Sequence, residues 1–397
     1  MAPKTHSLMW SGLALLIVYL AVSLPLPVIA TFVTEQLHFS NALGGLAVGA
    51  AFLTTIFTRG WAGRFSDKRG GQLCLFYGLA LYSLAIFICF LAAWRMSQPS
   101  LALILLLVGR ALLGVGESFA IVGILSWRID LKGPDRSGLV FAVVGAVMYG
   151  SLAIGGPLGL YIYKTWGLAK LTLVCLPLPL MGWVMFSLAP KSAPRPAKQK
   201  TPFLSIIGRV WAQGTVVGLQ GVGFALIGAF INRYFANKGW LGAGYALTAF
   251  GAGFVLTRLC FGRLPDLYGG YRVAVVALSL EALGQALLWL APFSAVALGG
   301  AFLTGLGCSL VYPAMGLEII KISAPEIRGA AVGAFAIFQD VAYGATAPVV
   351  GFFIDHFGYS IVFPLGLLAA ILGLILALIL KKSAYIKTKE RESLAQN

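Results

Sequence analysis

The sequence predicts an all-α membrane protein in which twelve transmembrane helices form two pseudo-symmetric six-helix bundles. Three observations predict this fold class. Hydrophobic residues make up 59% of the chain and charged residues only 11%, whereas soluble globular chains carry about 25% charged residues. Apolar runs long enough to cross a bilayer fill the chain from end to end. A fourteen-residue string that starts at position 58 also recurs, in part, at position 257, half the chain length later.

Breaks made of charged residues, Gly and Pro divide the chain into twelve apolar runs. A transmembrane helix needs about 20 mostly apolar residues, and each run is close to or above this length. We predict spans over residues 8–33, 41–60, 72–94, 100–126, 137–163, 171–188, 207–232, 242–260, 272–290, 295–320, 330–354 and 360–380.

A segment rich in Pro and Lys separates the first six runs from the last six. Its sequence, LAPKSAPRPAKQKTP over residues 188–202, has no helical pattern and is typical of a linker. The predicted organisation is an N-terminal bundle over 1–188, a cytoplasmic linker over 189–206, a C-terminal bundle over 207–380 and a charged cytoplasmic tail over 381–397.

The net charge of +16 is explained by topology. Of the 29 Lys and Arg residues, 23 fall on the side that holds both termini, the linker and the repeated string. By the positive-inside rule both termini are cytoplasmic, and we predict a multi-pass protein of the bacterial inner membrane. Nothing then requires a nucleic-acid partner. The five Cys include no CxxC motif or Cys/His cluster, so neither a metal site nor a cofactor is expected.

Each copy of the internal repeat lies at the predicted cytoplasmic end of the second helix of its half. TRGWAGRFSDKRGG at 58–71 and TRLCFGRLPDLYGG at 257–270 agree at seven of fourteen positions, with an offset of 199 residues. A second pair, PDRSG at 134–138 and PEIRG at 325–329, has an offset of 191, which Pro157 and Pro348 share. Two halves repeated in parallel around a midplane site are typical of a transporter.

These motifs resemble the major facilitator superfamily. The family's loop pattern is met by Gly63, Asp67, Lys68 and Gly70, although the second copy has Leu267 where a basic residue is usual. The fourth-helix pattern is met by Arg110, Gly114 and Gly116, and the stretch GLEIIKISAPEIRGAAVGAFAIFQD is similar to bacterial arabinose-efflux-type permeases. The resemblance implies that the loops gate transport through Gly63, Arg64, Asp67, Lys68, Gly70, Gly262, Arg263, Asp266 and Gly269.

Physical reasoning gives these loop residues specific tasks. Gly63 and Gly70 are expected to allow a sharp turn and a close approach of helices. Asp67 is expected to accept backbone N–H groups at a neighbouring helix N-terminus, while Arg59 and Arg64 pair with acids across the halves. The alternative is that these charges only fix the topology.

Charged residues within the apolar runs are functional candidates because each is costly at membrane depth. Glu117 lies seven residues after Arg110 on the fourth helix, about 10.5 Å along its axis on the same face. We predict that Glu117 carries the coupling proton and that Arg110 tunes it, the alternative being a static pair. Asp340 is the second candidate carboxylate. Glu281 lies on the ninth helix, which the resemblance implies is peripheral, so a structural polar contact is expected there.

The resemblance further implies that the first, fourth, seventh and tenth helices line the substrate cavity. Arg233 is expected near an exit path, although an interfacial role fits it equally. SLPLP at 23–27 and GGPLG at 155–159 are expected to bend helices or permit close packing. The predicted cavity residues are Tyr19, Ser23, Gln220, Asn232, Arg233 and Tyr312.

The first functional hypothesis is a proton-coupled exporter, or antiporter, of small organic molecules that works by alternating access. A second is an importer or facilitator of an organic anion bound by Arg110 and Arg233. A membrane-embedded enzyme or a non-transporting sensor has no supporting nucleophile, metal cluster or phosphate loop. The expected partners are a small-molecule substrate, protons and the lipid bilayer, and the expected state is a monomer.

Overall fold

The chain folds into long helices because a backbone in hydrocarbon must satisfy its N–H and C=O groups within the segment that crosses. The protein is seen in a computed structural model that describes residues 6–132, 137–188, 203–323 and 328–396. Its first half contains α1 (His6–Ser23), η1 (Leu26–Val28), α2 (Ile29–Thr31), η2 (Phe32–Gln36), α3 (Asn41–Arg69), α4 (Gly71–Trp94), α5 (Pro99–Lys132), α6 (Ser137–Cys175) and α7 (Pro177–Ser187).

The second half contains α8 (Phe203–Asn237), α9 (Ala243–Phe261), α10 (Leu264–Tyr268), α11 (Gly270–Leu290), α12 (Ser294–Ile322), α13 (Arg328–Phe357), η5 (Tyr359–Ile361) and α14 (Val362–Gln396). Eleven segments of the described chain are long and apolar enough to cross a membrane. One of them, Val143–Ser187, is broken at Gly167, where φ is 75°. Split at this break, it supplies two spans, and the twelve predicted spans are confirmed. The predicted linker over 189–206 falls mostly outside the described residues.

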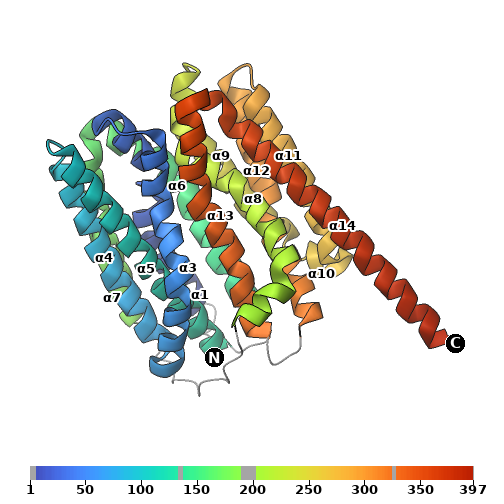
Figure 1. Ribbon diagram of the computed structural model, residues 1–397. Coiled ribbons are helices and arrows are strands. Elements are labelled where there is room, and N and C mark those ends of the chain that lie inside the picture. Colours follow the sequence, from blue (N-terminus) through green and yellow to red (C-terminus); the bar gives the residue numbers. More distant parts are fainter. Residues whose placement is uncertain (1–5, 133–136, 189–202, 324–327, 397) are drawn as a thin grey trace.

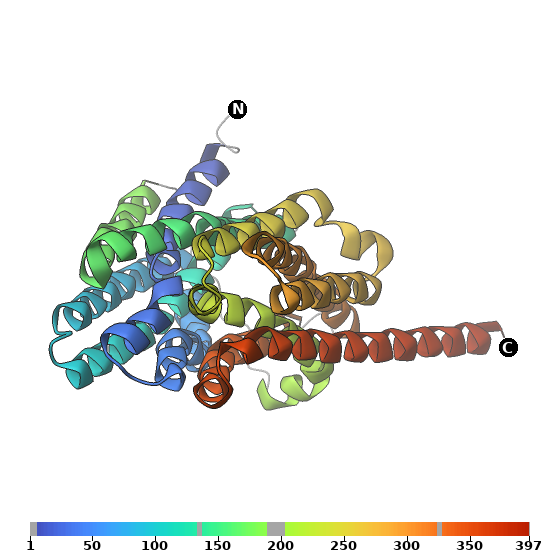
Figure 2. The same ribbon diagram turned by 90° about the horizontal axis from the view of Figure 1, so that it is seen from above.

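Two groups of helices stand side by side (Figures 1 and 2). Both marked chain ends lie at the lower side of Figure 1, and we call this side the terminus face and the other side the opposite face. Between the halves, α3 packs on α13 and α6 packs on α9. The predicted architecture of two six-helix halves is confirmed.

The contacts between the halves repeat the internal symmetry of the sequence. A Cβ at Gly45 of α3 would overlap the backbone of α13 at Ala347, directly before Pro348. Gly244, which is Gly45 plus the 199-residue offset, meets α6 at Pro157, where an added Cβ would lie 2.7 Å from the proline Cα. Because small residues let helix backbones approach closely, both crossings are tight on the opposite face.

The two predicted helix-bending motifs pack against each other. The first span changes from α1 through the 3-10 turn η1 directly after Ser23, because Pro25 and Pro27 cannot continue the helical hydrogen bonds. An added Cβ at Gly155 of α6 would lie 2.7 Å from the Cβ of Ser23. The predicted close packing at both motifs is therefore confirmed.

The repeated loops are more helical than the sequence indicates. Helix α3 continues to Arg69, so Gly63 lies inside a helix and no heavy atom would lie within 4 Å of its added Cβ. The prediction that Gly63 allows a turn and a close approach is wrong, because flanking Ala, Arg, Phe and Lys residues sustain the helix. The turn is made by Gly70 (φ 90°) and, in the second copy, by Gly269 (φ 87°).

The C-terminal segment is also helical. The last span was predicted to end at residue 380, but α14 continues to Gln396 and extends beyond the other helices (Figures 1 and 2). Lys, Ala and Glu, which dominate this segment, are good helix formers in water. The charged tail thus prolongs the last helix.

Candidate transport cavity

A cavity of about 510 Å³ lies between the two halves. Its wall comes from α1, α3, α5 and α6 of the first half and from α8, α9, α12 and α13 of the second. It extends to the terminus face, where the exposed Asp266 of α10 lines it. The resemblance predicted four wall helices, and the structure adds four more, because α3, α6, α9 and α13 cross at the interface.

Glu117 lines the cavity from the middle of α5 and is mostly buried. Its Oε1 accepts a hydrogen bond of 3.0 Å from Tyr19 Oη of α1. Ser23, one turn further along α1, also lines the cavity and shares a 2.8 Å hydrogen bond with Ser151 Oγ of α6. The predicted cavity residues Tyr19, Ser23 and Tyr312 therefore lie where the sequence placed them.

Asp340 and Arg59 join the two halves within the cavity wall. Arg59 Nη2 of α3 lies 2.9 Å from each carboxylate oxygen of Asp340 in α13. The Asp340 side chain is 9% exposed and that of Arg59 is 27% exposed, so water screens the pair only in part. The prediction that Arg59 pairs with an acid across the halves is confirmed.

Arg110 is not in this cavity wall. Its Nε donates to the Ala47 carbonyl at 3.0 Å and its Nη2 donates to the Val48 carbonyl at 3.2 Å, both in α3. Although Arg110 and Glu117 share a helix, Arg110 ties α5 to α3 instead of reaching Glu117. The structure places Arg59, not Arg110, at the cavity acids.

A second arginine, Arg258 of α9, also lines the cavity. Its guanidinium carbon lies 5.2 Å from the centre of the Phe254 ring, and its Nε has no hydrogen-bond partner in the described chain. The sequence argument missed Arg258, near the end of the span predicted over 242–260, because it counted this arginine only among the basic residues that set the topology. The signal was present, since Thr-Arg begins both copies of the string.

Three predicted cavity or exit residues lie elsewhere. Gln220 is 1% exposed and faces the interior of the second half near Cys308. Asn232 Nδ2 donates to Thr31 Oγ1 at 3.0 Å, and Arg233 forms an ion pair with Glu35. These last two residues connect α8 to the first half on the opposite face, which removes them from the cavity wall.

Further polar contacts close the opposite face. The Asp355 carboxylate of α13 accepts hydrogen bonds from Asn41 N at 2.9 Å, Asn41 Nδ2 at 2.7 Å and Ala42 N at 3.1 Å. Tyr359 Oη accepts from Arg233 Nε at 3.1 Å and donates to Asn41 Oδ1. The acid of one half thus caps the N-terminus of α3 in the other, where a negative charge is favourable.

The predicted gating residues lie on the terminus face. Arg64, Asp67, Lys68, Arg263 and Asp266 are all exposed. Among them only Asp266 lines the cavity between the halves. In this conformation the opposite face is closed and the loop charges face solvent.

Glu281 of α11 is fully buried outside the cavity, and neither carboxylate oxygen has a hydrogen-bond partner that meets normal geometry in the described chain. Gly223 and Gly307 make room for it, since an added Cβ at either would lie 2.6 to 2.8 Å from its side chain. The Cys308 thiol, which reaches the cavity, lies against this carboxyl.

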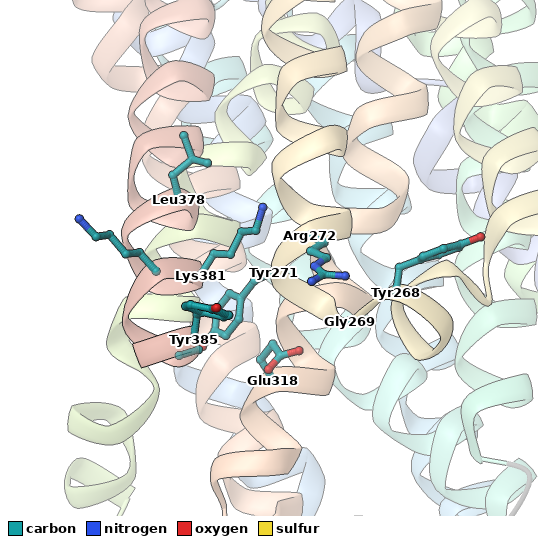
Figure 3. A pocket seen from close by; sticks show the side chains of 10 residues that line it. Tyr268, Gly269, Tyr271, Arg272, Glu318, Leu378, Lys381 and Tyr385 are labelled. Carbon is teal, nitrogen blue, oxygen red and sulfur yellow. The ribbon is translucent and has the colours of Figure 1, made fainter. Parts of the chain in front are cut away.

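A separate groove of about 590 Å³ lies at the terminus face within the second half. Figure 3 shows Tyr268 and Arg272 on one side of it, and Lys381 and Tyr385 on α14 on the other. Glu318 at its base accepts hydrogen bonds from Gly270 N at 2.8 Å and Lys321 Nζ at 2.9 Å. Glu318 and Lys321, three residues apart on α12, thus form an ion pair.

Comparisons with known proteins agree with this geometry. A family model described as Major Facilitator Superfamily matches residues 12–241 and 237–396. An uncharacterized MFS-type transporter of Salmonella typhimurium is 40% identical over 360 residues, which is 91% of this chain and 92% of the relative. A second one, from Pseudomonas aeruginosa, is 36% identical over 366 residues, which is 92% of this chain and 90% of the relative.

Two solved structures share the fold. The human organic anion transporter MFSD10 superposes with a TM-score of 0.70 at 16% identity, covering 95% of this chain and all of the other. The nucleoside transporter NupG superposes with a TM-score of 0.71 at 14% identity, covering 93% of this chain and 98% of the other. At these identities the likeness concerns the fold alone.

Proposed function

Because this chain belongs to the major facilitator superfamily of membrane transporters, we propose that it is a proton-coupled exporter that exchanges protons for small organic molecules by alternating access. It is a multi-pass membrane transporter and not an enzyme. The observation that carries the finer proposal is the Arg59–Asp340 ion pair, which joins the two halves inside the cavity.

Protonation at this pair changes how the halves interact. A charge-assisted contact in a partly buried site is worth about 1.5–3 kcal/mol. When Asp340 takes up a proton, its ionic attraction for Arg59 is lost, which weakens the contact between α3 and α13 inside the cavity. Because one discrete contact distinguishes two arrangements of the halves, proton uptake biases their equilibrium.

Glu117 supplies a second protonation site beside the substrate. Tyr19 Oη donates to its carboxylate, and no cation of the described chain forms an ion pair with it. A substrate group that binds Glu117 then competes with a proton for the same carboxylate, and such competition is the basis of antiport. Arg110 is assigned instead to helix packing.

The excess of Lys and Arg on the terminus face supports a cytoplasmic location for that face, in the bacterial inner membrane. The cavity reaches this face while the opposite face is closed. Substrate then enters from the cytoplasm, which fits an exporter. Protons and a small organic molecule are the proposed partners, acting on a monomer without a cofactor.

Proton movement in reconstituted vesicles tests this proposal. Purified protein is first screened by thermal shift against drugs, sugars and carboxylates, because a ligand that prefers the folded state raises the unfolding midpoint. Stabilising compounds are then added outside vesicles that contain a pH-sensitive dye. We expect the lumen to become more alkaline as the compound enters. If the lumenal pH does not change when the compound is added, proton coupling is contradicted.

A second candidate function is cotransport of a proton with an organic anion. Arg258 in the cavity wall favours it, because this arginine has no ion-pair partner among the described residues. It takes the anion-binding role that the sequence assigned to Arg110 and Arg233, since both of these bind other residues. The same vesicles separate the two functions, since cotransport acidifies the lumen as the compound enters.

A further inference from the structure

The sequence offsets between the two halves pair residues that line the cavity in one half with residues at equivalent positions in the other half. The offset of 199 residues pairs Arg59 with Arg258, and the offset of 191 pairs GVGES at 114–118 with GLGCS at 305–309. The offset of 191 also pairs Asp340 with Tyr149. Both arginines line the same cavity.

Contacts in the structure support these pairings. Gly49 of α3 packs on Gly344 of α13, and its counterpart Thr248 donates to the Ala153 carbonyl of α6 at 2.8 Å. In the first half, Ser118 Oγ donates to the Thr55 carbonyl at 3.4 Å, and its counterpart Ser309 Oγ donates to the Phe254 carbonyl at 2.9 Å. The two sides of the cavity are therefore built from equivalent positions.

The two halves differ in the residues that surround these two arginines, because in the described chain only the arginine of the first half has carboxylates beside it. Arg59 is paired with Asp340 and also faces Glu117. The counterparts of these acids around Arg258 are Tyr149 and Cys308, neither of which carries a negative charge in its ordinary form. Among the residues that the structure describes, no carboxylate lies within ion-pair distance of Arg258.

Aromatic rings replace the missing acids. Tyr149 stacks on Phe254 with ring centres 3.6 Å apart, and Phe224 approaches Tyr149 edge-on at 5.5 Å. All three side chains line the cavity together with Arg258. An arginine at membrane depth is costly unless a counter-ion or hydrogen-bond acceptor compensates it. Here the guanidinium carbon of Arg258 lies 5.2 Å from the centre of the Phe254 ring, and its Nε has no hydrogen-bond partner in the described chain.

We propose that Arg258 binds the anionic group of the transported molecule, a carboxylate or sulfonate, while Tyr149, Phe224 and Phe254 pack on its apolar part. Arg258 presents a planar fork that fits such groups in a bidentate manner. The substrate class is thus a small amphipathic organic anion. This inference rests on the proposed function only in taking the cavity between the halves as the substrate site.

Matched pairs of ligands test the charge that Arg258 recognises. The probes are 4-phenylbutanoate and 2-naphthoate with their uncharged primary amides, and binding to the purified full-length protein is measured by calorimetry without any proton gradient. We expect each acid to bind at least about 10-fold more tightly than its amide. Arg258→Gln should weaken binding of the acids by about 10- to 100-fold, with Arg258→Lys in between.

Gly145 offers a complementary variant. An added Cβ there would lie 3.9 Å from Arg258 Nη2, with no closer atom. Gly145→Asp therefore gives Arg258 an internal carboxylate, and it should abolish binding of the acids, while the isosteric Gly145→Asn should not. Arg272→Gln makes the same charge change outside this cavity and should leave binding unchanged.

The outcomes that overturn the proposal are explicit. It is wrong if acid and amide bind the wild-type protein equally, if no acid binds, or if folded Arg258→Gln keeps wild-type affinity for the acids. Far-ultraviolet circular dichroism and the unliganded unfolding midpoint report folding of each variant. Because binding is measured at equilibrium, a failure of proton coupling in vesicles does not affect this result, and the two proposals fail separately.

Discussion

Removal of the Asp355 carboxylate should open the opposite face. Asp355 of α13 accepts three hydrogen bonds from Asn41 and Ala42 at the N-terminus of α3, in the other half. These bonds exist only while the two halves meet on that face. In Asp355→Ala they are lost, and the conformation that is open on the opposite face gains population.

The expected size follows from the contact and its exposure. Loss of a side-chain cap at a helix N-terminus costs about 0.5–2 kcal/mol, and the charge there contributes about 0.3–1 kcal/mol. Because Asp355 is exposed, we take the combined effect as about 1–2 kcal/mol. The equilibrium between closed and open opposite face should shift by about 5- to 30-fold. Asp355→Asn keeps one acceptor oxygen and should shift it less.

Pulsed electron spin resonance measures this shift directly. Spin labels are placed on Gln36→Cys and Asn237→Cys, two exposed positions on the opposite face in different halves, with the exposed Cys260 replaced by Ser. Asp355→Ala should add or enlarge a population of longer distances. If the folded variant keeps the wild-type distance distribution, Asp355 does not hold the halves together.

Three other predictions concern single side chains. Glu117→Gln should remove the pH dependence of transport in vesicles, because the amide cannot take up a proton; an unchanged pH profile removes Glu117 from the coupling mechanism. Asp67→Asn should leave membrane insertion intact and abolish transport, and normal flux by this variant contradicts a gating role. Glu281→Gln should change the free energy of unfolding by less than about 1 kcal/mol, since the carboxyl has no ion-pair partner in the described chain; a loss of several kcal/mol in denaturant titration refutes this.

The helices were predictable because bilayer thickness and hydrogen-bond satisfaction leave few choices for an apolar chain. The gap predicted between the fifth and sixth spans contains Gly167, where the structure shows the break. The helical structure of the repeated loops was harder to predict. Gly63 and the polar residues around it indicate a turn, whereas the flanking Ala, Arg, Phe and Lys residues favour a helix. Likewise, the polar composition after residue 380 indicated that the last helix ends there, although α14 continues to Gln396.

The site was predictable only in part because its contacts join distant segments. Glu117 and Asp340 were found because each carboxylate stands out in an apolar run, and Tyr19 was found because the family resemblance assigns the first helix to the cavity wall. Arg59 and Arg64 were expected to pair with acids across the halves, but no acid was assigned to either, since 281 residues separate Arg59 from Asp340 in sequence. Arg258 and Asp355 were missed because their importance depends on how the halves cross, and Arg110 was overvalued because backbone acceptors are invisible in sequence.

Distances measured across both faces of one protein test the central claim of alternating access most directly. The opposite-face pair at Gln36 and Asn237 is combined with a terminus-face pair at Arg69 and Ile322, all exposed positions. As pH or a bound ligand changes the populations, the account predicts that one distance lengthens while the other shortens. Distances that stay fixed under all conditions, or that change in the same direction on both faces, would contradict it.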